Sequence, residues 1–262
     1  MNREEYWNEQ YLEYWRERTT DSNRRLVTTD CVPANVLLFE HYLKLLDIKP
    51  GDKILEVGVG FGRLIPSLVK RGASVFGVDI STAMIEEARK NYGSQVAELK
   101  AISAEELPYP DATFDNVVCW AVFDACYQRR ALSEMSRVLK LGGGLLITGK
   151  NDDYEDDDEL AYVAEVNARA KGHPNYFTNM PAFMKAMSAH GLGVSQTFFF
   201  RRRGDFSVND FTQMVSPRFY EYLFVCRKEK HVVSEAAGEL ASSYSLTFAR
   251  RDPAGTERVR EN

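Results

Sequence analysis

The chain has 262 residues, 44% of them hydrophobic, and no run of apolar residues long enough to cross a bilayer, so we expect a soluble globular protein. Its 38 acidic side chains outnumber 33 basic ones, and the resulting charge of −5 argues against nucleic-acid and membrane partners. The charged, aromatic N-terminus is unlike a secretory signal, which favours a cytoplasmic location. The four cysteines show no metal-ligand spacing, so neither a metal site nor a disulfide framework is predicted.

The first 48 residues are expected to form helices that cover an edge of the main domain. Tyrosine and tryptophan gather between positions 6 and 15, and an apolar stretch runs from Val36 to Leu46. The aromatic residues are suited to fixing the N-terminal helix on the core and to covering a pocket as a lid.

Short apolar strands alternate with segments of helical spacing in the middle of the chain. We predict strands at Lys53–Val57, Ser74–Val78, Phe114–Trp120 and Gly144–Thr148. Because parallel strands need crossover connections, this alternation predicts a doubly wound, mostly parallel α/β sheet.

Two helices of this region are predicted in detail. Ser81 is a suitable N-cap for the helix after the second strand, and Gly93 ends that helix. The helix before Gly142 is predicted to bury Leu132, Met135 and Leu139.

A helical insertion is expected at about residues 150–190, with helices at Leu160–Ala170 and Pro181–His190. We expect strands at 194–203 and 218–228 to close a seven-stranded sheet as an antiparallel hairpin. Together with the parallel strands they define one domain, at residues 49–230.

The remaining residues, 231–262, form a polar tail. It is rich in Ala, Ser, Glu and Arg, which predicts a loosely held helix or partial disorder.

A glycine-rich loop and a following acid carry the strongest functional signal. A buried strand ends at Glu56 and leads into Gly58, Gly60 and Gly62, where side chains would block the approach of a ligand. Asp79 ends the next strand, 21 residues beyond Gly58, where a carboxylate can accept both ribose hydroxyl protons. Loop and acid together indicate a nucleoside-binding site.

The kind of nucleoside depends on two residues beside the loop. A dinucleotide fingerprint needs a third glycine where this chain has Arg63, which weakens the interpretation as a nicotinamide-dependent oxidoreductase. Glu56 would repel a pyrophosphate and attract a cationic amino-acid end. Both residues also have a purely structural interpretation, with Glu56 as the partner of a buried Arg63.

Five motifs in order resemble the class I S-adenosylmethionine-dependent methyltransferases, particularly their small-molecule branch. The glycine loop is similar to the first motif, and the others are Val78–Ser81, Ala104–Tyr109, Phe114–Val118 and Glu134–Gly144. The resemblance covers the chain closely from about residue 50 to residue 150.

This resemblance implies S-adenosylmethionine as the cofactor and assigns residues to its parts. Glu56 and the loop glycines would face the methionine end, and Asp79 the ribose. Ile80 and Met84 would contact the plane of the adenine.

The resemblance also assigns the adenine edge and the acceptor side. Ala104 and Glu105 would line the adenine edge, and Trp120 would lie beside the cofactor near the acceptor. Ser103 stands where the family often has Asp or Asn, so its hydroxyl or the Glu105 carboxylate would take over that contact.

Methyl transfer from a sulfonium is a direct displacement, which needs alignment and desolvation more than a metal or a covalent intermediate. An acceptor hydroxyl would also need a base, for which Asp124, Tyr127 and His173 are candidates. A loop histidine such as His173 is equally suited to a solvated or capping role. The chain lacks the Pro-Pro-aromatic element of DNA-amine methyltransferases, which favours a small-molecule acceptor. We expect the aromatic N-terminus and the insertion at about residues 150–190 to form a lid over that acceptor.

Two charged segments and one alternative function remain open. The acidic run at 152–159 is compatible with a divalent cation or with a solvated helix start. Arg201, Arg202 and Arg203 are compatible with a substrate phosphate or with a surface role. A catalytically silent module that binds S-adenosylmethionine stays as the alternative to an enzyme, and the oligomeric state stays open.

Overall fold

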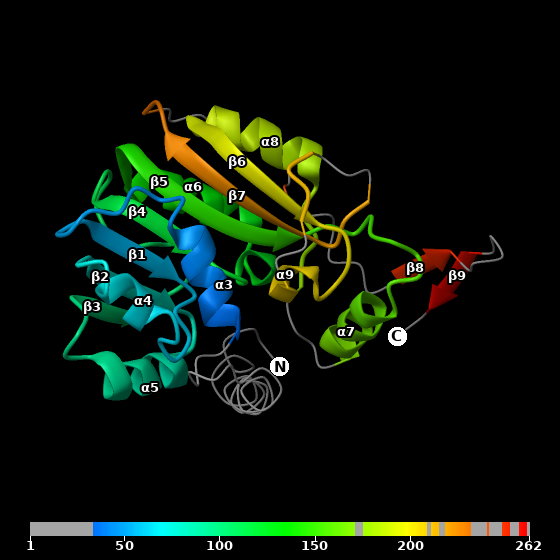
Figure 1. The fold of residues 1–262 in the computed structure, drawn as a ribbon, viewed down its shortest axis with the longest axis horizontal. Helices are drawn as coiled ribbons and strands as arrows, with labels where there is room; N and C mark the ends of the chain where they lie inside the picture. The colour runs from blue at the N-terminus through cyan, green and yellow to red at the C-terminus, as the bar shows by residue number, and fades with distance from the viewer. Residues whose placement is uncertain are drawn as a thin grey trace.

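The computed structural model describes residues 34–170, 175–208, 211–214, 218–231, 240, 248–251 and 257–260. Its centre is a seven-stranded sheet in the order β3-β2-β1-β4-β5-β7-β6 (Figure 1). The strands are β1 Lys53–Val57, β2 Ser74–Asp79, β3 Glu98–Ala101, β4 Phe114–Cys119, β5 Leu139–Lys150, β6 Leu192–Phe200 and β7 Glu221–Lys228.

The first five strands are parallel to one another, and β7 runs antiparallel to both β5 and β6. The predicted fold is thereby confirmed: a doubly wound, mostly parallel α/β sheet with an antiparallel C-terminal hairpin. Because β1, β2 and β4 end on the same edge, the residues that follow them meet there.

Helices cover both faces of this sheet. They are α3 Ala34–Leu43, α4 Ile65–Val69, α5 Thr82–Tyr92, α6 Gln128–Val138, α7 Glu159–Ala170, α8 Met180–Ala189 and the short α9 Asp205–Val208, with a 3₁₀ turn, η1, at Phe123–Ala125. In Figure 1, α3 and α9 lie on one face and α6 and α8 on the other. α7 lies beyond the end of the sheet at which β5 terminates.

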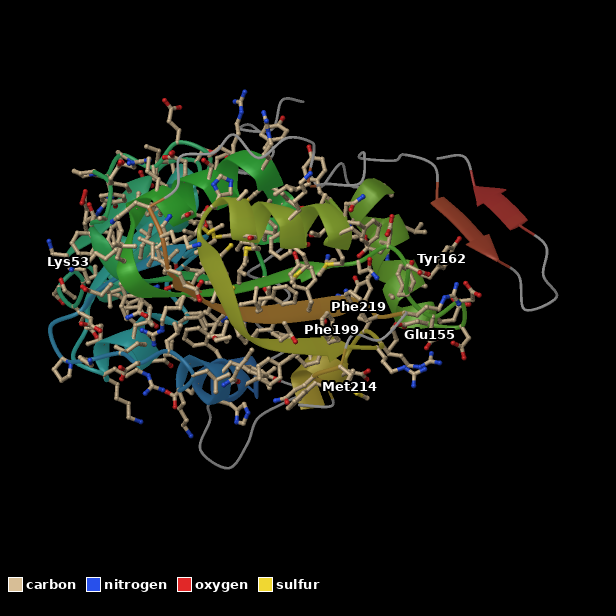
Figure 2. All side chains as sticks on the ribbon, turned by 90° about the horizontal axis from the view of Figure 1, so that it is seen from above. Lys53, Glu155, Tyr162, Phe199, Met214 and Phe219 are labelled. Carbon is tan, nitrogen blue, oxygen red and sulfur yellow. The ribbon has the colours of Figure 1, made fainter. Side chains whose placement is uncertain are left out.

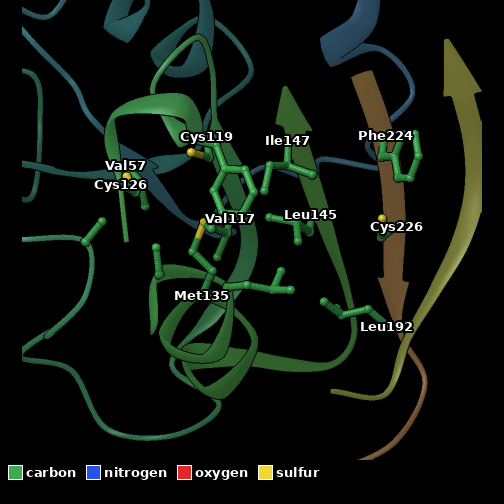
Figure 3. Packing of buried hydrophobic residues seen from close by; sticks show 14 of the residues in the cluster. Val57, Val117, Cys119, Cys126, Met135, Leu145, Ile147, Leu192, Phe224 and Cys226 are labelled. Carbon is green, nitrogen blue, oxygen red and sulfur yellow. The ribbon is translucent and has the colours of Figure 1, made fainter. Parts of the chain in front are cut away.

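Strand alternation divides the core into two clusters. Leu145 and Ile147 pack with Met135 of α6 on one face, as Figure 3 shows. Leu146 points to the other face and packs in the cluster that contains Tyr42 of α3. Because the central strands are buried on both faces of the sheet, their sequences are nearly continuous apolar runs.

The local predictions hold with one change. Ser81 caps α5, since its hydroxyl accepts a hydrogen bond from the Met84 amide at 3.2 Å, and the helix ends before Gly93. Leu139, expected in the helix before Gly142, instead begins β5, because that strand starts earlier than its apolar run.

The structure describes only part of the N-terminal segment, the insertion at about residues 150–190 and the C-terminal tail. Residues 1–33 lie outside the described residues, so the N-terminal lid is represented only by α3 and the segment that follows it. The two insertion helices occur as expected. In the tail, for which the sequence predicted a loosely held helix or partial disorder, Phe248–Arg251 and Glu257–Arg260 pair as antiparallel strands. Among the described residues, no helix is long and apolar enough to cross a membrane.

Candidate functional site

The loop after β1 is tied to the end of β2 by the predicted acid. One carboxylate oxygen of Asp79 accepts the Gly60 amide proton and the other accepts the Ser81 amide proton, each at 2.9 Å. Gly58, Gly60 and Gly62 all have positive φ angles, of 74°, 54° and 83°, which favour glycine. Asp79 therefore orients the loop, and each of its oxygens keeps capacity for a further donor.

A narrow pocket of ≈ 60 Å³ opens beside this loop. Five of the predicted cofactor residues line it, namely Gly58, Asp79, Ile80, Ser103 and Ala104, together with Val57, Val78, Ile102, Val122, Ala125 and Cys126. The ends of β1 and β2 thus meet the segments after β3 and β4 around one hollow, as the sequence predicted for a ligand site at this edge.

The glycine loop leaves less open space at Gly58 than the sequence predicted. A Cβ on Gly58 would lie 2.6 Å from Val122 Cγ1, so the Val122 side chain occupies the room that the missing side chain leaves. At Gly60, by contrast, no atom lies within 4 Å of such a Cβ. The open approach to the loop backbone is therefore at Gly60, and Val122 narrows the pocket at Gly58.

Replacing Gly58 by alanine is expected to displace Val122 and to lower stability by roughly 1–3 kcal/mol through overpacking, in addition to the strain of its φ angle. Gly60→Ala carries the backbone strain without the clash. Urea unfolding of both variants measures the difference, and equal losses would show that Val122 does not constrain Gly58.

Glu56 is buried below the loop, and its Oε2 has no hydrogen-bond partner within the described part of the chain. Burial raises the pKa of this carboxyl to about 8, against the opposing effect of the nearby Arg63, and Asp79 raises it further. A buried acid of this kind is poised to ionise when a second cation arrives.

The segment after β3 is joined to the segment after β4. The Ser103 hydroxyl contacts Glu105 Oε2, and Glu105 Oε1 accepts the Tyr127 amide proton at 2.6 Å. Ser103 lines the pocket, whereas Glu105 acts here as a brace between two loops.

The other predicted cofactor residues lie outside the pocket lining: Glu56, Gly60, Gly62, Met84, Glu105 and Trp120. Trp120 lies in the aromatic cluster on the opposite core face, with ring centroids 5.1 Å from Phe39 and 4.9 Å from Phe206. Met84 is buried in the first turn of α5. Both side chains are buried in the packing around the site and are absent from the lining of the pocket.

The three candidate bases are placed differently. Asp124 in η1 forms a 2.8 Å ion pair with Lys150 and is mostly buried. Tyr127 is 51% exposed at the start of α6, with its ring 6.0 Å from that of Tyr176. His173 lies outside the described residues.

The two charged segments singled out in the sequence pair with each other. Arg202 contacts Asp157 at 2.7 Å and Arg218 contacts Asp156 at 2.9 Å, while Arg201 pairs with Glu155. Figure 2 shows Glu155 at the α7 end of the molecule, away from Lys53. The acidic run therefore forms ion pairs with arginines, and in the described part of the chain no group of three His, Cys, Asp or Glu side chains is placed to hold a metal ion.

Comparisons with known proteins agree on the central region. A family model described as a methyltransferase domain matches residues 55–147. With a TM-score of 0.60, the fold is similar to magnesium protoporphyrin IX methyltransferase from Synechocystis PCC 6803, at 17% identity over 86% of this chain and 97% of that one. Residues 55–147 therefore form a methyltransferase domain.

Curated relatives of this methyltransferase domain share its central part. The chain is 37% identical over 45% of its length to phosphatidylethanolamine N-methyltransferase from Cereibacter sphaeroides, of which it covers 60%. It is 40% identical over 36% of its length to demethylmenaquinone methyltransferase from Symbiobacterium thermophilum, of which it covers 41%. The chain thus spans about half the length of these relatives.

Proposed function

We propose that this protein transfers the methyl group of S-adenosylmethionine to a small-molecule acceptor. The observation that carries the proposal is the Asp79 carboxylate, which faces the pocket beside the glycine loop and holds the Gly60 and Ser81 amides. The relatives support a small acceptor, since their names refer to phosphatidylethanolamine, demethylmenaquinone and a porphyrin.

The residues present fit an adenosyl sulfonium. Asp79 would accept hydrogen bonds from ribose hydroxyls, while Ile80, Ile102 and Ala104 offer an apolar slot for a base. Glu56 has a buried oxygen without a partner, close enough to Asp79 and Arg63 to interact with both electrostatically. That oxygen suits the cationic end of the molecule, where a cation would restore the balance of charge.

When bound, the cofactor supplies an electrophilic methyl group on a positively charged sulfur. The protein's part is to fix that group in line with an acceptor and to exclude water, which in model systems accounts for about 7–11 kcal/mol of the barrier. The Asp79-tethered loop provides rigidity. Val122 and Cys126 provide an apolar wall against water.

A labelled-methyl assay tests the proposal. The protein is incubated with methyl-labelled S-adenosylmethionine and fractionated small metabolites, and transfer of label to one fraction is the expected result. Binding of the cofactor without transfer to any fraction would instead favour the silent module. Absence of binding would contradict the proposal altogether.

Cofactor binding is expected to release protons at neutral pH. Glu56, with a pKa of about 8 raised by burial, is mostly protonated at pH 7 in the free protein. An arriving cation lowers this pKa, so up to one proton leaves on binding. The apparent enthalpy of cofactor binding, measured by calorimetry, should differ between phosphate and Tris buffers, because the buffer takes up the released proton. Glu56→Gln should remove the part of this difference that comes from the Glu56 proton. An unchanged buffer dependence in Glu56→Gln would show that another group ionises.

A further inference from the structure

A second group of polar side chains, beyond the pocket lining, meets at the carboxyl end of β5. Lys150, the last residue of β5, contacts Asp124 at 2.8 Å and Glu165 of α7 at 3.5 Å. The Tyr220 hydroxyl donates to Glu165 at 2.5 Å, and Arg203 donates to that hydroxyl at 2.8 Å. We refer to Asp124, Lys150, Glu165, Arg203, Tyr220 and Glu221 as the ionic centre.

Glu221 differs from the other acids of the ionic centre. Asp124 and Glu165 are held by Lys150, whereas the Glu221 carboxylate has no hydrogen-bond or ion-pair partner among the described residues. Glu221 lies opposite Lys150 in the β5–β7 register, so both side chains project from the same face of the sheet. The centre therefore contains one carboxylate with free acceptor capacity.

The pKa of the Glu221 carboxyl lies close to neutral pH. Burial raises its pKa to about 7, with Arg203 and Lys150 lowering it and Asp124 and Glu165 raising it again. Such a group gains and loses a proton near physiological pH, which suits a general base.

The ionic centre borders the cofactor pocket. Asp124 belongs to η1, and its neighbours Val122, Ala125 and Cys126 line the pocket. Thr148 lies two residues before Lys150 on β5, and its hydroxyl accepts the Ala121 amide proton at 2.7 Å. This hydrogen bond also links β5 to the segment that follows β4. The pocket and the ionic centre therefore share the segment that follows β4, at the edge of the sheet where β4 and β5 end.

The charge balance of the centre indicates the kind of ligand it attracts. The carboxyl groups of Asp124, Glu165 and Glu221 interact here with two cations, Lys150 and Arg203, so the centre carries a net negative charge when Glu221 is ionised. The neighbouring acidic run adds seven carboxylates between residues 152 and 159, which within the described part of the chain are contacted by four arginines: Arg201, Arg202, Arg203 and Arg218. A negative field of this kind favours a cationic group over an anionic one.

We propose that the ionic centre binds an acceptor that carries a primary or secondary amino group, and that Glu221 takes the proton which this amine must lose. This inference rests on the proposed function and names the acceptor class of the same site. The arriving ammonium gives one proton to the Glu221 carboxylate and becomes a neutral amine with a lone pair. The lone pair forms the new bond to the methyl carbon as the carbon–sulfur bond breaks, and that electron pair stays on sulfur. The product is a methylated ammonium, and Glu221 returns its proton to water.

The test uses labelled S-adenosylmethionine and pairs of amines and alcohols with the same skeleton, such as 2-phenylethylamine with 2-phenylethanol and hexylamine with hexan-1-ol. We expect the full-length protein to methylate amines at least about tenfold faster than their matched alcohols. Glu221→Gln should lower kcat/KM for the amine by about 10²–10⁴-fold and remove the ionisation near pH 7 from its acidic limb. Glu221→Asp should restore part of the rate.

Glu229→Gln is the matched control, because it removes an exposed carboxylate just beyond the far end of β7. Its kcat/KM and pH profile should equal those of the unmodified protein, and S-adenosylmethionine affinity should change less than threefold in both glutamine variants. Preference for the alcohols, transfer to neither member of any pair, or a Glu221→Gln profile like that of Glu229→Gln overturns the inference. If the unmodified protein does not bind S-adenosylmethionine, the proposed function itself is refuted.

Discussion

Replacing Asp79 by alanine is expected to weaken S-adenosylmethionine binding by about 10²–10⁴-fold, because two charge-assisted hydrogen bonds to the ribose, at about 1.5–3 kcal/mol each, are lost. The same change frees the Gly60 and Ser81 amides, so the loop also loses its tether to β2. Isothermal titration calorimetry on the purified protein measures the affinity.

Asp79→Asn separates the two contributions. An amide oxygen can keep one of the backbone hydrogen bonds, but the group has no charge and accepts at one atom only. Glu86→Ala, which removes an exposed carboxylate from α5, is the control and should bind as the unmodified protein does. An affinity of Asp79→Ala within threefold of the unmodified protein would remove the nucleoside assignment of this site.

Replacing Lys150 by methionine is expected to lower the free energy of unfolding by about 3–5 kcal/mol, since it removes the cation that contacts both Asp124 and Glu165 in a buried setting. Although burial opposes it, the charges of Asp124, Tyr220 and Glu165 hold the pKa of Lys150 well above its ordinary value. The raised pKa means that its stabilising contribution is complete below the ordinary lysine pKa and is lost only in strongly alkaline solution. Urea denaturation at pH 7 measures the change.

Lys140→Met provides the comparison, because Lys140 makes a similar 2.7 Å contact with Asp115 but is 42% exposed. Exposed ion pairs contribute about 0–1 kcal/mol, so this variant should unfold within about 1 kcal/mol of the unmodified protein. Equal losses in the two variants would show that the ionic centre is no more than a surface network.

The central domain was predictable because its signals are local. The apolar runs of β1, β2 and β4, the Ser81 cap and the spacing from the glycine loop to Asp79 each depend on residues close in the chain. Parallel pairing then forces the ends of β1 and β2 onto one edge, so Asp79 meets the loop as the sequence predicted. The resemblance in five motifs rests on the same local patterns.

The roles of particular side chains were less predictable. Trp120 was expected beside the cofactor, and the structure places it, one residue after the end of β4, in the core cluster that contains Tyr42 of α3. Gly58 was expected to leave open space, but Val122, which follows β4, fills it. Both outcomes depend on how a loop returns after its strand, which strand periodicity does not specify.

The sequence by itself determined the kind of sheet, most of its parallel strands and the acid that meets the glycine loop, because each follows from short-range periodicity and spacing. Only the tertiary structure decided the partners of the charged residues. Glu165 and Tyr220 are 55 residues apart, and Arg202 and Asp157 are 45 residues apart, so nothing local indicates that they meet. Charges carry no periodic signal of their own, and their partners depend on where the insertion lies against β5 and β7.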